Sequence, residues 1–392
     1  MDTKKVLPVL FATMFLVMVG FGIIIPILPF YTESLGASVT GLGWLMAIYS
    51  ITQFIFAPMW GKVSDKVGRK PIILVGIIGL ALSFFLMAIA KTFAFMFIAR
   101  TVGGILSAAN MTTVMAYVAD ITTEENRAKG MGMVGAATGL GFVFGPAIGG
   151  VLSDISLVLP FIVSGVCATI TAIGVFFFLK ESPTKVKRHD TSEKKSATKI
   201  LFSNDGLLLV LQVLVTLSLA TLEVTFAYFA AEKIGMDSFT LGFVFMIMGL
   251  CGAAVQGGLI GVLVKKLGEQ KVIMLGLALS TVGFITILFI SNFITAAIFI
   301  SIFGVGNGLI RPCITTILTK KSLTSNGQIS GLIASSDSLG RILGPIAGST
   351  LFAYSINLPY YFGILLTVLG FFMFIVYKLR NEQKMTLKTT NS

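Results

Sequence analysis

Charged residues are scarce in this 392-residue chain: Asp, Glu, Lys and Arg make up 12% of it, against 55% for the hydrophobic set. The mean hydropathy is +0.95, whereas ordinary soluble domains contain about 25% charged residues. This shortage of charge excludes an ordinary soluble domain. It predicts a polytopic membrane protein.

Histidine and cysteine are also scarce, with one His and three Cys in the chain. Cys167, Cys251 and Cys313 are odd in number and all lie in apolar runs, so we expect packing residues and no disulfide framework. We expect no metal site and no cofactor. A phosphate-binding G-x-x-x-x-G-K-[ST] pattern is absent, which disfavours an ATP-driven pump. The sequence has neither paired catalytic groups in its apolar runs nor a second domain, which disfavours an enzyme or a sensor.

Long apolar runs dominate what is present. A bilayer core about 30 Å thick needs roughly 20 apolar residues per helical span. Continuous runs of that length predict helices, because β-barrel strands would be short and alternating. The expected fold class is all-α, with twelve transmembrane helices. The predicted spans are 6–30, 40–61, 72–90, 93–119, 127–152, 159–179, 206–230, 240–264, 272–290, 294–318, 328–352 and 358–378.

Most of the 29 basic residues fall in the segments on the same side of the membrane as the two termini. Cytoplasmic segments carry the excess of Lys and Arg, so both termini are expected to be cytoplasmic in a multi-pass protein of the cell membrane. The net charge of +12 therefore reports orientation in the bilayer. It does not indicate nucleic-acid binding, which would need one basic face on a soluble domain.

The chain divides into two similar halves. We expect a six-helix bundle over 1–179, a basic cytoplasmic linker over 180–205, a second six-helix bundle over 206–378 and a cytoplasmic tail over 379–392. "GKVSDKVGRK" at Gly61 is echoed by "GVLVKKLGEQ" at Gly261, and "GPAIGG" at Gly145 by "GPIAGS" at Gly344. Two parallel six-helix repeats are the plan of secondary transporters.

The loop motif "GKVSDKVGRKP" spans residues 61–71. Gly61 and Gly68 allow a tight turn, Asp65 can accept hydrogen bonds at a helix start, and Arg69 holds the cytoplasmic side. The second copy has Lys265 in place of the acid. Any gating ion pair is therefore expected in the first half.

A glycine signature, G-x8-G-x3-G-P-x2-G-G, occupies the fifth span. Its members are Gly132, Gly141, Gly145, Pro146, Gly149 and Gly150. Glycines four apart let helix backbones approach closely, and a proline bends a helix. We therefore expect this span to pack tightly against a neighbour near Gly145.

These motifs resemble the major facilitator superfamily, and within it the twelve-span drug:proton antiporters of the NorA and Bmr kind, over residues 6–378. The resemblance implies a monomeric, cofactor-free antiporter that exports lipophilic, often cationic drugs by alternating access, and so a part in multidrug efflux and antibiotic resistance. The alternative is a same-fold exporter of one physiological solute, such as a sugar, lipid or peptide.

Glu223 is the unexpected residue, since it lies inside the apolar span 206–230. A carboxyl in a low-dielectric site is driven toward its neutral form, so it can take a proton from one side and release it to the other. Phe226, Tyr228 and Phe229 suggest an aromatic-lined site for lipophilic cations, to which Asn110 and Asn307 add polar contacts. The alternative is a carboxylate neutralised by a buried arginine for structure alone.

Three arginines and one further acid also lie within spans. Arg100 is expected to face protein or water, because a charge in hydrocarbon is unfavourable; the resemblance gives it a part in proton transfer, with a structural role as the alternative. Asp337 and Arg341 are four apart and are expected to pair. Arg311 is the remaining candidate partner.

Two further positions bear on the coupling acids. The antiporters often have an acid three residues before the Arg-Pro of span ten, where this chain has Gly308. Either Asp337 replaces that acid, or proton coupling rests on Glu223 alone. Asp120, at the inner end of span four, is expected to be solvated or to contact a loop.

Overall fold

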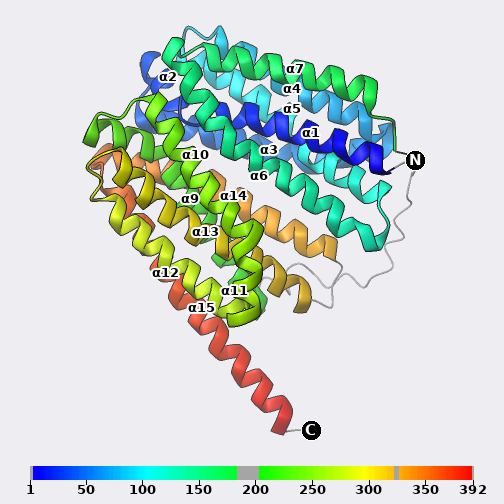
Figure 1. Cartoon of the computed structure of the whole chain (residues 1–392), viewed down its shortest axis with the longest axis vertical. Helices are drawn as coiled ribbons and strands as arrows, with labels where there is room; N and C mark the ends of the chain where they lie inside the picture. Colours follow the sequence, from blue (N-terminus) through cyan, green and yellow to red (C-terminus); the bar gives the residue numbers. More distant parts are fainter. Residues whose placement is uncertain (1–2, 183–202, 322–325, 391–392) are drawn as a thin grey trace. The chain divides into compact units, whose positions relative to one another are not determined.

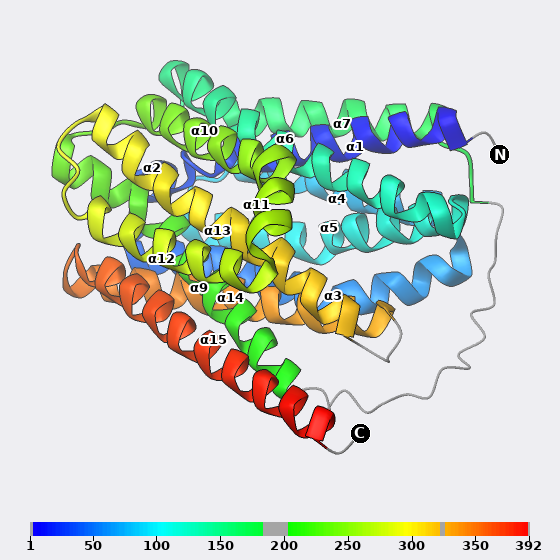
Figure 2. The same ribbon diagram turned by 60° about the horizontal axis from the view of Figure 1, so that its bottom comes forward.

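The computed structural model describes residues 3–182, 203–321 and 326–390, and within them every regular element is a helix (Figure 1 and Figure 2). The helices are α1 (Thr3–Ile24), α2 (Leu28–Ser34), α3 (Val39–Val67), α4 (Arg69–Ala88), α5 (Phe93–Ile121), α6 (Glu124–Ile155), α7 (Leu159–Phe178), α9 (Asn204–Ile234), α10 (Ser238–Ala254), the π-helical turn η1 (Val255–Leu259), α11 (Ile260–Leu267), α12 (Glu269–Ile287), α13 (Phe293–Lys321), α14 (Asn326–Tyr354) and α15 (Leu358–Thr390). The all-α fold predicted from the sequence is confirmed.

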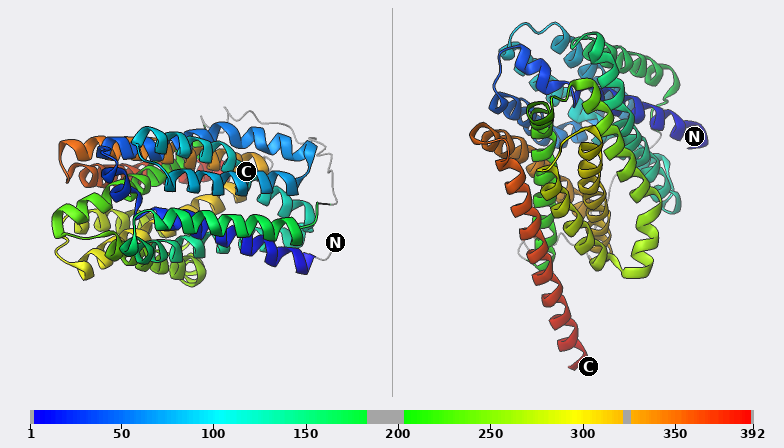
Figure 3. Two further views of the ribbon diagram at one scale, coloured as in Figure 1. Left: turned by 90° about the horizontal axis from the view of Figure 1, so that it is seen from above. Right: turned by 60° about the vertical axis from the view of Figure 1, so that its left-hand side comes forward.

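Eleven helical segments of the described chain are long and apolar enough to cross a membrane. The expected span 328–352 forms as α14, but it is not among the eleven. Asp337, Arg341 and several serines lower its hydropathy. α15 runs past the expected span 358–378 into the tail, as the orange-to-red helix of Figure 3 shows.

The helices group into two compact units, residues 1–188 with 235–249, and residues 189–234 with 250–392. In the first unit α1 packs on α6 and α7, while α4 packs on α5 and α7. In the second unit α9 packs on α14 and α15, and α12 packs on α13 and α15. Most of the expected linker, 180–205, lies outside the described residues, and the division into two six-helix bundles stays a prediction.

The glycine signature brings α6 against α1. A Cβ built on Gly145 would lie 2.7 Å from the Gly22 Cα, and one built on Gly141 would lie 2.8 Å from the backbone carbon of Met18. Real Cβ atoms do not approach backbone this closely. The close packing expected near Gly145 is confirmed.

The second half repeats this device between α14 and α9. A Cβ on Gly344 would lie 2.7 Å from the Ala220 Cβ and 2.8 Å from the Leu217 carbonyl oxygen. The loop motifs repeat as well, because Gly68 and Gly268 both have positive φ and each directly precedes a helix. The similarity of the two halves therefore extends to backbone conformation.

Two predicted spans are interrupted. The first, expected over 6–30, divides into α1 and α2, because Pro26 has no N–H to continue the helix. The eighth, expected over 240–264, contains the π-helical turn η1, which includes the pair Gly257 and Gly258. Such turns insert a residue into the hydrogen-bond ladder and are frequent at functional sites.

We predict that Gly145→Ala lowers the free energy of unfolding of the detergent-solubilised protein by about 1–3 kcal/mol, because the added methyl meets backbone that cannot move aside. Gly139→Ala is the matched control, since a Cβ at Gly139 of the same helix meets nothing within 4 Å. Equal unfolding midpoints for the two variants would show that α1 and α6 do not depend on this contact.

Candidate functional site: charged groups within the helices

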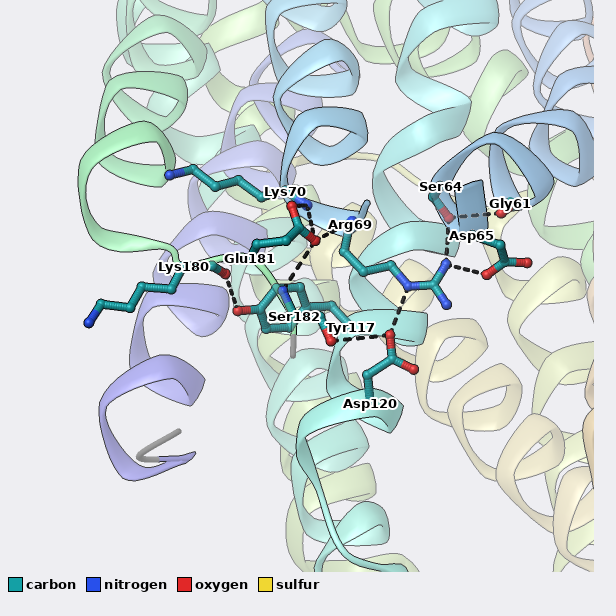
Figure 4. Close-up of polar contacts among 10 residues, drawn as sticks. All are labelled: Gly61, Ser64, Asp65, Arg69, Lys70, Tyr117, Asp120, Lys180, Glu181 and Ser182. Carbon is teal, nitrogen blue, oxygen red and sulfur yellow. Dashed lines mark hydrogen bonds and ion pairs between the residues drawn. The ribbon is translucent and has the colours of Figure 1, made fainter. Parts of the chain in front are cut away.

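The turn between α3 and α4 gathers the charged residues of the loop motif (Figure 4). The Arg69 guanidinium contacts Asp65, with Nη1 2.6 Å from Oδ1, and its Nε donates to Asp120 Oδ2 at 2.8 Å. The Asp120 side chain is 11% exposed and that of Asp65 63%, so the bond to Asp120 is the better shielded from water. Asp120 thus contacts the loop, the second of its two expected roles.

Glu181, which follows α7, closes the same cluster. Its carboxylate accepts from the backbone N–H of Arg69 at 2.6 Å and of Lys70 at 3.2 Å (Figure 4). These are the first residues of α4, whose N-cap, Gly68, has no side chain to accept those hydrogen bonds. A Cβ on Gly68 would lie 2.9 Å from the Glu181 carboxyl carbon, so Gly68 serves both the turn and this contact.

Glu181 was not among the residues predicted from the sequence. The available signal was an acid directly after an apolar span, on the same side as the loop motif. The hydroxyl of Tyr117 donates to the Lys180 carbonyl oxygen, and Ser182 Oγ donates to Asp120 Oδ2 at 3.4 Å. The ends of α3, α4, α5 and α7 are therefore joined in one polar cluster (Figure 4).

Asp337 on α14 is the most fully satisfied acid inside a span of the second unit. Its Oδ1 accepts from Gln212 Nε2 at 2.6 Å and from Thr216 Oγ1 at 2.9 Å, and its Oδ2 pairs with the Arg311 guanidinium. The expected pairing with Arg341 is wrong. Helix α13 supplies the cation instead, and Arg311 can also reach solvent because its side chain is 54% exposed.

Gln212 and Thr216 were likewise not predicted from the sequence. They are four residues apart on α9 and so lie on one helix face, and Glu223 follows Gln212 by eleven residues, or about three turns, on that face. A polar stripe in an otherwise apolar helix was the available signal.

Glu223 is half-buried on α9. Among the residues that the structure describes, none forms a hydrogen bond or an ion pair with its carboxylate. Arg341 is the cation that acts on it electrostatically. The two acids of this unit therefore differ: Asp337 is held by three donors, whereas Glu223 has only the field of an arginine.

The aromatic residues expected around Glu223 lie on several faces of α9. Phe226 shares the face of Glu223 by its three-residue spacing and is fully buried. Tyr228 lies 6.0 Å from Phe352, and Phe229 lies 4.4 Å from Tyr360, between ring centroids. The role of Phe226, Tyr228 and Phe229 as substrate contacts stays a prediction.

The two asparagines expected to contact substrate differ. Asn110 is 4% exposed and its amide has no hydrogen-bond partner among the described residues, while Asn307 donates to the Val215 carbonyl oxygen at 3.4 Å. Both roles stay predictions. The described residues contain no cluster of three or more His, Cys, Asp or Glu that could hold a metal.

Arg100 lies within α5 in the first unit and is 4% exposed. Its guanidinium carbon lies 4.1 Å from the centroid of the Tyr49 ring and 5.4 Å from that of Phe21. Its buried Nε has no hydrogen-bond partner among the described residues. As expected, Arg100 faces protein.

Comparison with known proteins decides the family. A family model described as "Major Facilitator Superfamily" matches residues 10–334 and 208–391. The chain belongs to this superfamily. It is 31% identical over 380 residues to "Multidrug resistance protein 1" of Bacillus subtilis (strain 168), covering 96% of this chain and 98% of that protein. It is 28% identical to "Quinolone resistance protein NorA" of Staphylococcus aureus (strain MSSA476), covering 99% and 100%.

Solved structures agree on the fold. The nucleoside transporter NupG superposes with a TM-score of 0.74 at 13% identity, covering 95% of this chain and 98% of that one. A bacterial homolog of the human lysosomal transporter Spinster gives 0.77 at 14% identity, covering 95% and 96%. At these identities the likeness concerns the fold alone.

This member of the major facilitator superfamily has Gly308 where an acid was expected in span ten. A Cβ on Gly308 would lie 3.4 Å from Gln256 Nε2. Gln256 belongs to η1, the π-helical turn. An uncharged amide therefore stands beside the position of the missing acid.

We predict that Glu181→Ala lowers the thermal unfolding midpoint, because two N–H groups at the start of α4 lose their acceptor. Asp154→Ala, which removes an exposed carboxylate near the end of α6, is the control. An Ala variant at Glu181 as stable as the control would argue against the capping role.

We predict that Asp337 and Arg311 are energetically coupled, with an interaction free energy of about 0.5–3 kcal/mol in a double-mutant cycle of Asp337→Asn and Arg311→Gln. Either change alone leaves a charge or its donors without a partner, so the double variant should lose less stability than the sum. The parallel cycle with Arg341→Gln should give the smaller coupling. A larger coupling free energy between Asp337 and Arg341 than between Asp337 and Arg311 would instead support the pairing with Arg341.

Proposed function

We propose that this chain is a proton-coupled antiporter that exports lipophilic, often cationic compounds by alternating access. Membership of the major facilitator superfamily and full-length similarity to proteins named for multidrug and quinolone resistance support it. No ATP is required, because proton entry supplies the free energy. The substrates are small molecules, the protein works as a monomer, and its medium is the lipid bilayer.

The contrast between the two acids of the second unit carries the proposal. Asp337 is held by three donors, one of them a cation, so we assign it the structural role. Glu223 lacks such donors among the described residues and is the acid free to gain and lose a proton. Arg311 then holds Asp337, and Arg341 is the cation that acts on Glu223 electrostatically.

One carboxyl at Glu223 makes the exchange obligatory. A proton and a substrate cation compete for the same negative charge, so each must leave before the other binds. Exchange of one proton for one monovalent cation moves no net charge across the membrane. The pH difference alone then drives export, at about 1.4 kcal/mol or tenfold accumulation per pH unit.

The distribution of basic residues supports an orientation with both termini in the cytoplasm of a cell whose plasma membrane the protein crosses. In that orientation the cluster of Arg69, Asp120 and Glu181 lies at the cytoplasmic ends of its helices. We infer that the cytoplasmic side opens when the contacts of this cluster break.

We predict that Glu223→Gln loses export of a permanent cation driven by a pH gradient in proteoliposomes, because the amide cannot exchange a proton. Glu223→Asp should keep partial activity with a shifted pH profile, since the charge moves by about one methylene. Glu232→Gln, at the exposed end of the same helix, is the matched control and should export normally.

The same assay tests the stoichiometry. Setting a potassium diffusion potential with valinomycin should leave the export of a monovalent cation unchanged in the wild type.

Full export of the cation by the Gln variant would make the carboxylate at Glu223 structural and would shift coupling to Asp337.

A further inference from the structure

Span eight is shared between the two compact units. Residues 238–249 of α10 belong to the first unit, and residues 250–254 belong to the second, together with η1 and α11. Of the helices that the structure describes, α10 is the one whose residues fall in both units. A movement of one unit away from the other must therefore bend this span or detach its first part from the first unit.

The first part of α10 packs closely on α6 within the first unit. A Cβ built on Gly150 of α6 would lie 2.8 Å from the carbonyl oxygen of Phe239. Next to this contact, Ser153 Oγ and Ser238 Oγ lie 2.8 Å apart and share a hydrogen bond. We call these four residues the α6–α10 latch. In the latch, glycine serves the close approach of two backbones.

The glycines of η1 have no such packing role. A Cβ built on Gly257 or on Gly258 would meet nothing within 4 Å. Both residues lie in the π-helical turn, where the α-helical hydrogen-bond ladder is already interrupted. Since space does not require glycine here, the property that remains is its backbone freedom, because glycine enters conformations that are unfavourable for other residues.

The corresponding span of the first half has neither the turn nor the freedom. Residues 55–59, which the repeated loop motifs align with η1, are α-helical within α3. Trp60 Nε1 donates to the Ile105 carbonyl oxygen at 2.7 Å, and Arg69 pairs with the acid of the loop motif. Among the described residues, no side chain of α11 forms a hydrogen bond or an ion pair. The second half is thus less firmly held at the equivalent place.

We propose that η1 is a hinge, and that span eight bends there when the α6–α10 latch opens. The segment α11 keeps its apolar contacts in the second unit, where Ile260, Leu263 and Val264 pack on the core, while the part of α10 before η1 leaves α6. One span then changes shape, in addition to the rocking of two halves. The hinge rests on the alternating access already proposed and supplies the element that bends.

Latch opening is measurable on the purified full-length protein without transport. Ser153 is 7% exposed, so a cysteine introduced by Ser153→Cys should react with a maleimide only when the latch opens. Adding Gly257→Ala and Gly258→Ala should slow this reaction about 5- to 30-fold, because each alanine disfavours departure from the helical conformation. The protein without Ser153→Cys measures the reaction of the native cysteines.

Gly174→Ala is the matched control. A Cβ at Gly174, inside α7 of the first unit, also meets nothing within 4 Å. The control and the η1 pair should both raise the thermal unfolding midpoint, since alanine is favoured over glycine in a helix. Only the η1 pair should slow the maleimide reaction and the initial rate of proton-driven export.

Equal reaction rates in the η1 variant and the control would overturn the hinge. If the alanine pair lowers the unfolding midpoint, the single change Gly258→Ala takes its place in the same comparison. Deletion of Gly258 removes one residue from the π turn and should also slow the reaction. A deletion variant that folds and reacts as fast as its parent would likewise contradict the proposal.

Failure of the proposed function remains distinguishable. If the maleimide reaction slows in the η1 variant but the wild type exports no cation in response to a pH gradient, the antiport mechanism is removed and the hinge is kept. Proton-driven export by the wild type, with a maleimide reaction that the η1 alanines leave unchanged, would keep the antiport mechanism and remove the hinge.

Discussion

Charge inside a membrane helix is the constraint on which this structure depends. A charged side chain at the centre of a bilayer is unfavourable by at least about 2.5–3.5 kcal/mol, so each one has to be compensated by protein, water or ligand. The chain is poor in charge overall, at 12%, and its few charges within helices account for most of its polar architecture. Their partners define which helices are joined.

The compensation takes different forms. Arg69 joins the ends of α3 and α5 through two acids, and Glu181 completes that cluster at the start of α4. Asp337 joins α14 to α9 and α13 through three donors. Arg100 has aromatic faces in place of an acid, and Glu223 has the weakest compensation of the acids within the spans. In the proposed mechanism, Asp337, whose hydrogen bonds are met, is the structural charge, and Glu223, whose hydrogen bonds are not, carries the proton.

The sequence was sufficient for features that depend on local pattern. Apolar runs predicted the helices, and the glycine spacing predicted the close approach at Gly145. It was not sufficient where the partner lies on another helix. Pairing Asp337 with Arg341 used helical spacing alone, yet the acid pairs with Arg311 on the separate helix α13. Glu181 was missed for the same reason, because its carboxylate caps α4 from a segment that follows α7 in the chain.

In the proposed mechanism, a substrate cation and a proton exclude each other at Glu223. The most direct measurement is calorimetric titration of a permanent cation into the purified protein, repeated in buffers of different ionisation enthalpy, which counts the protons released on binding. In a pH range where Glu223 is protonated in the free protein, the wild type should release about one proton per cation bound, and Glu223→Gln should release none. Cation binding without proton release in the wild type at every pH, or equal release by the variant, would contradict it.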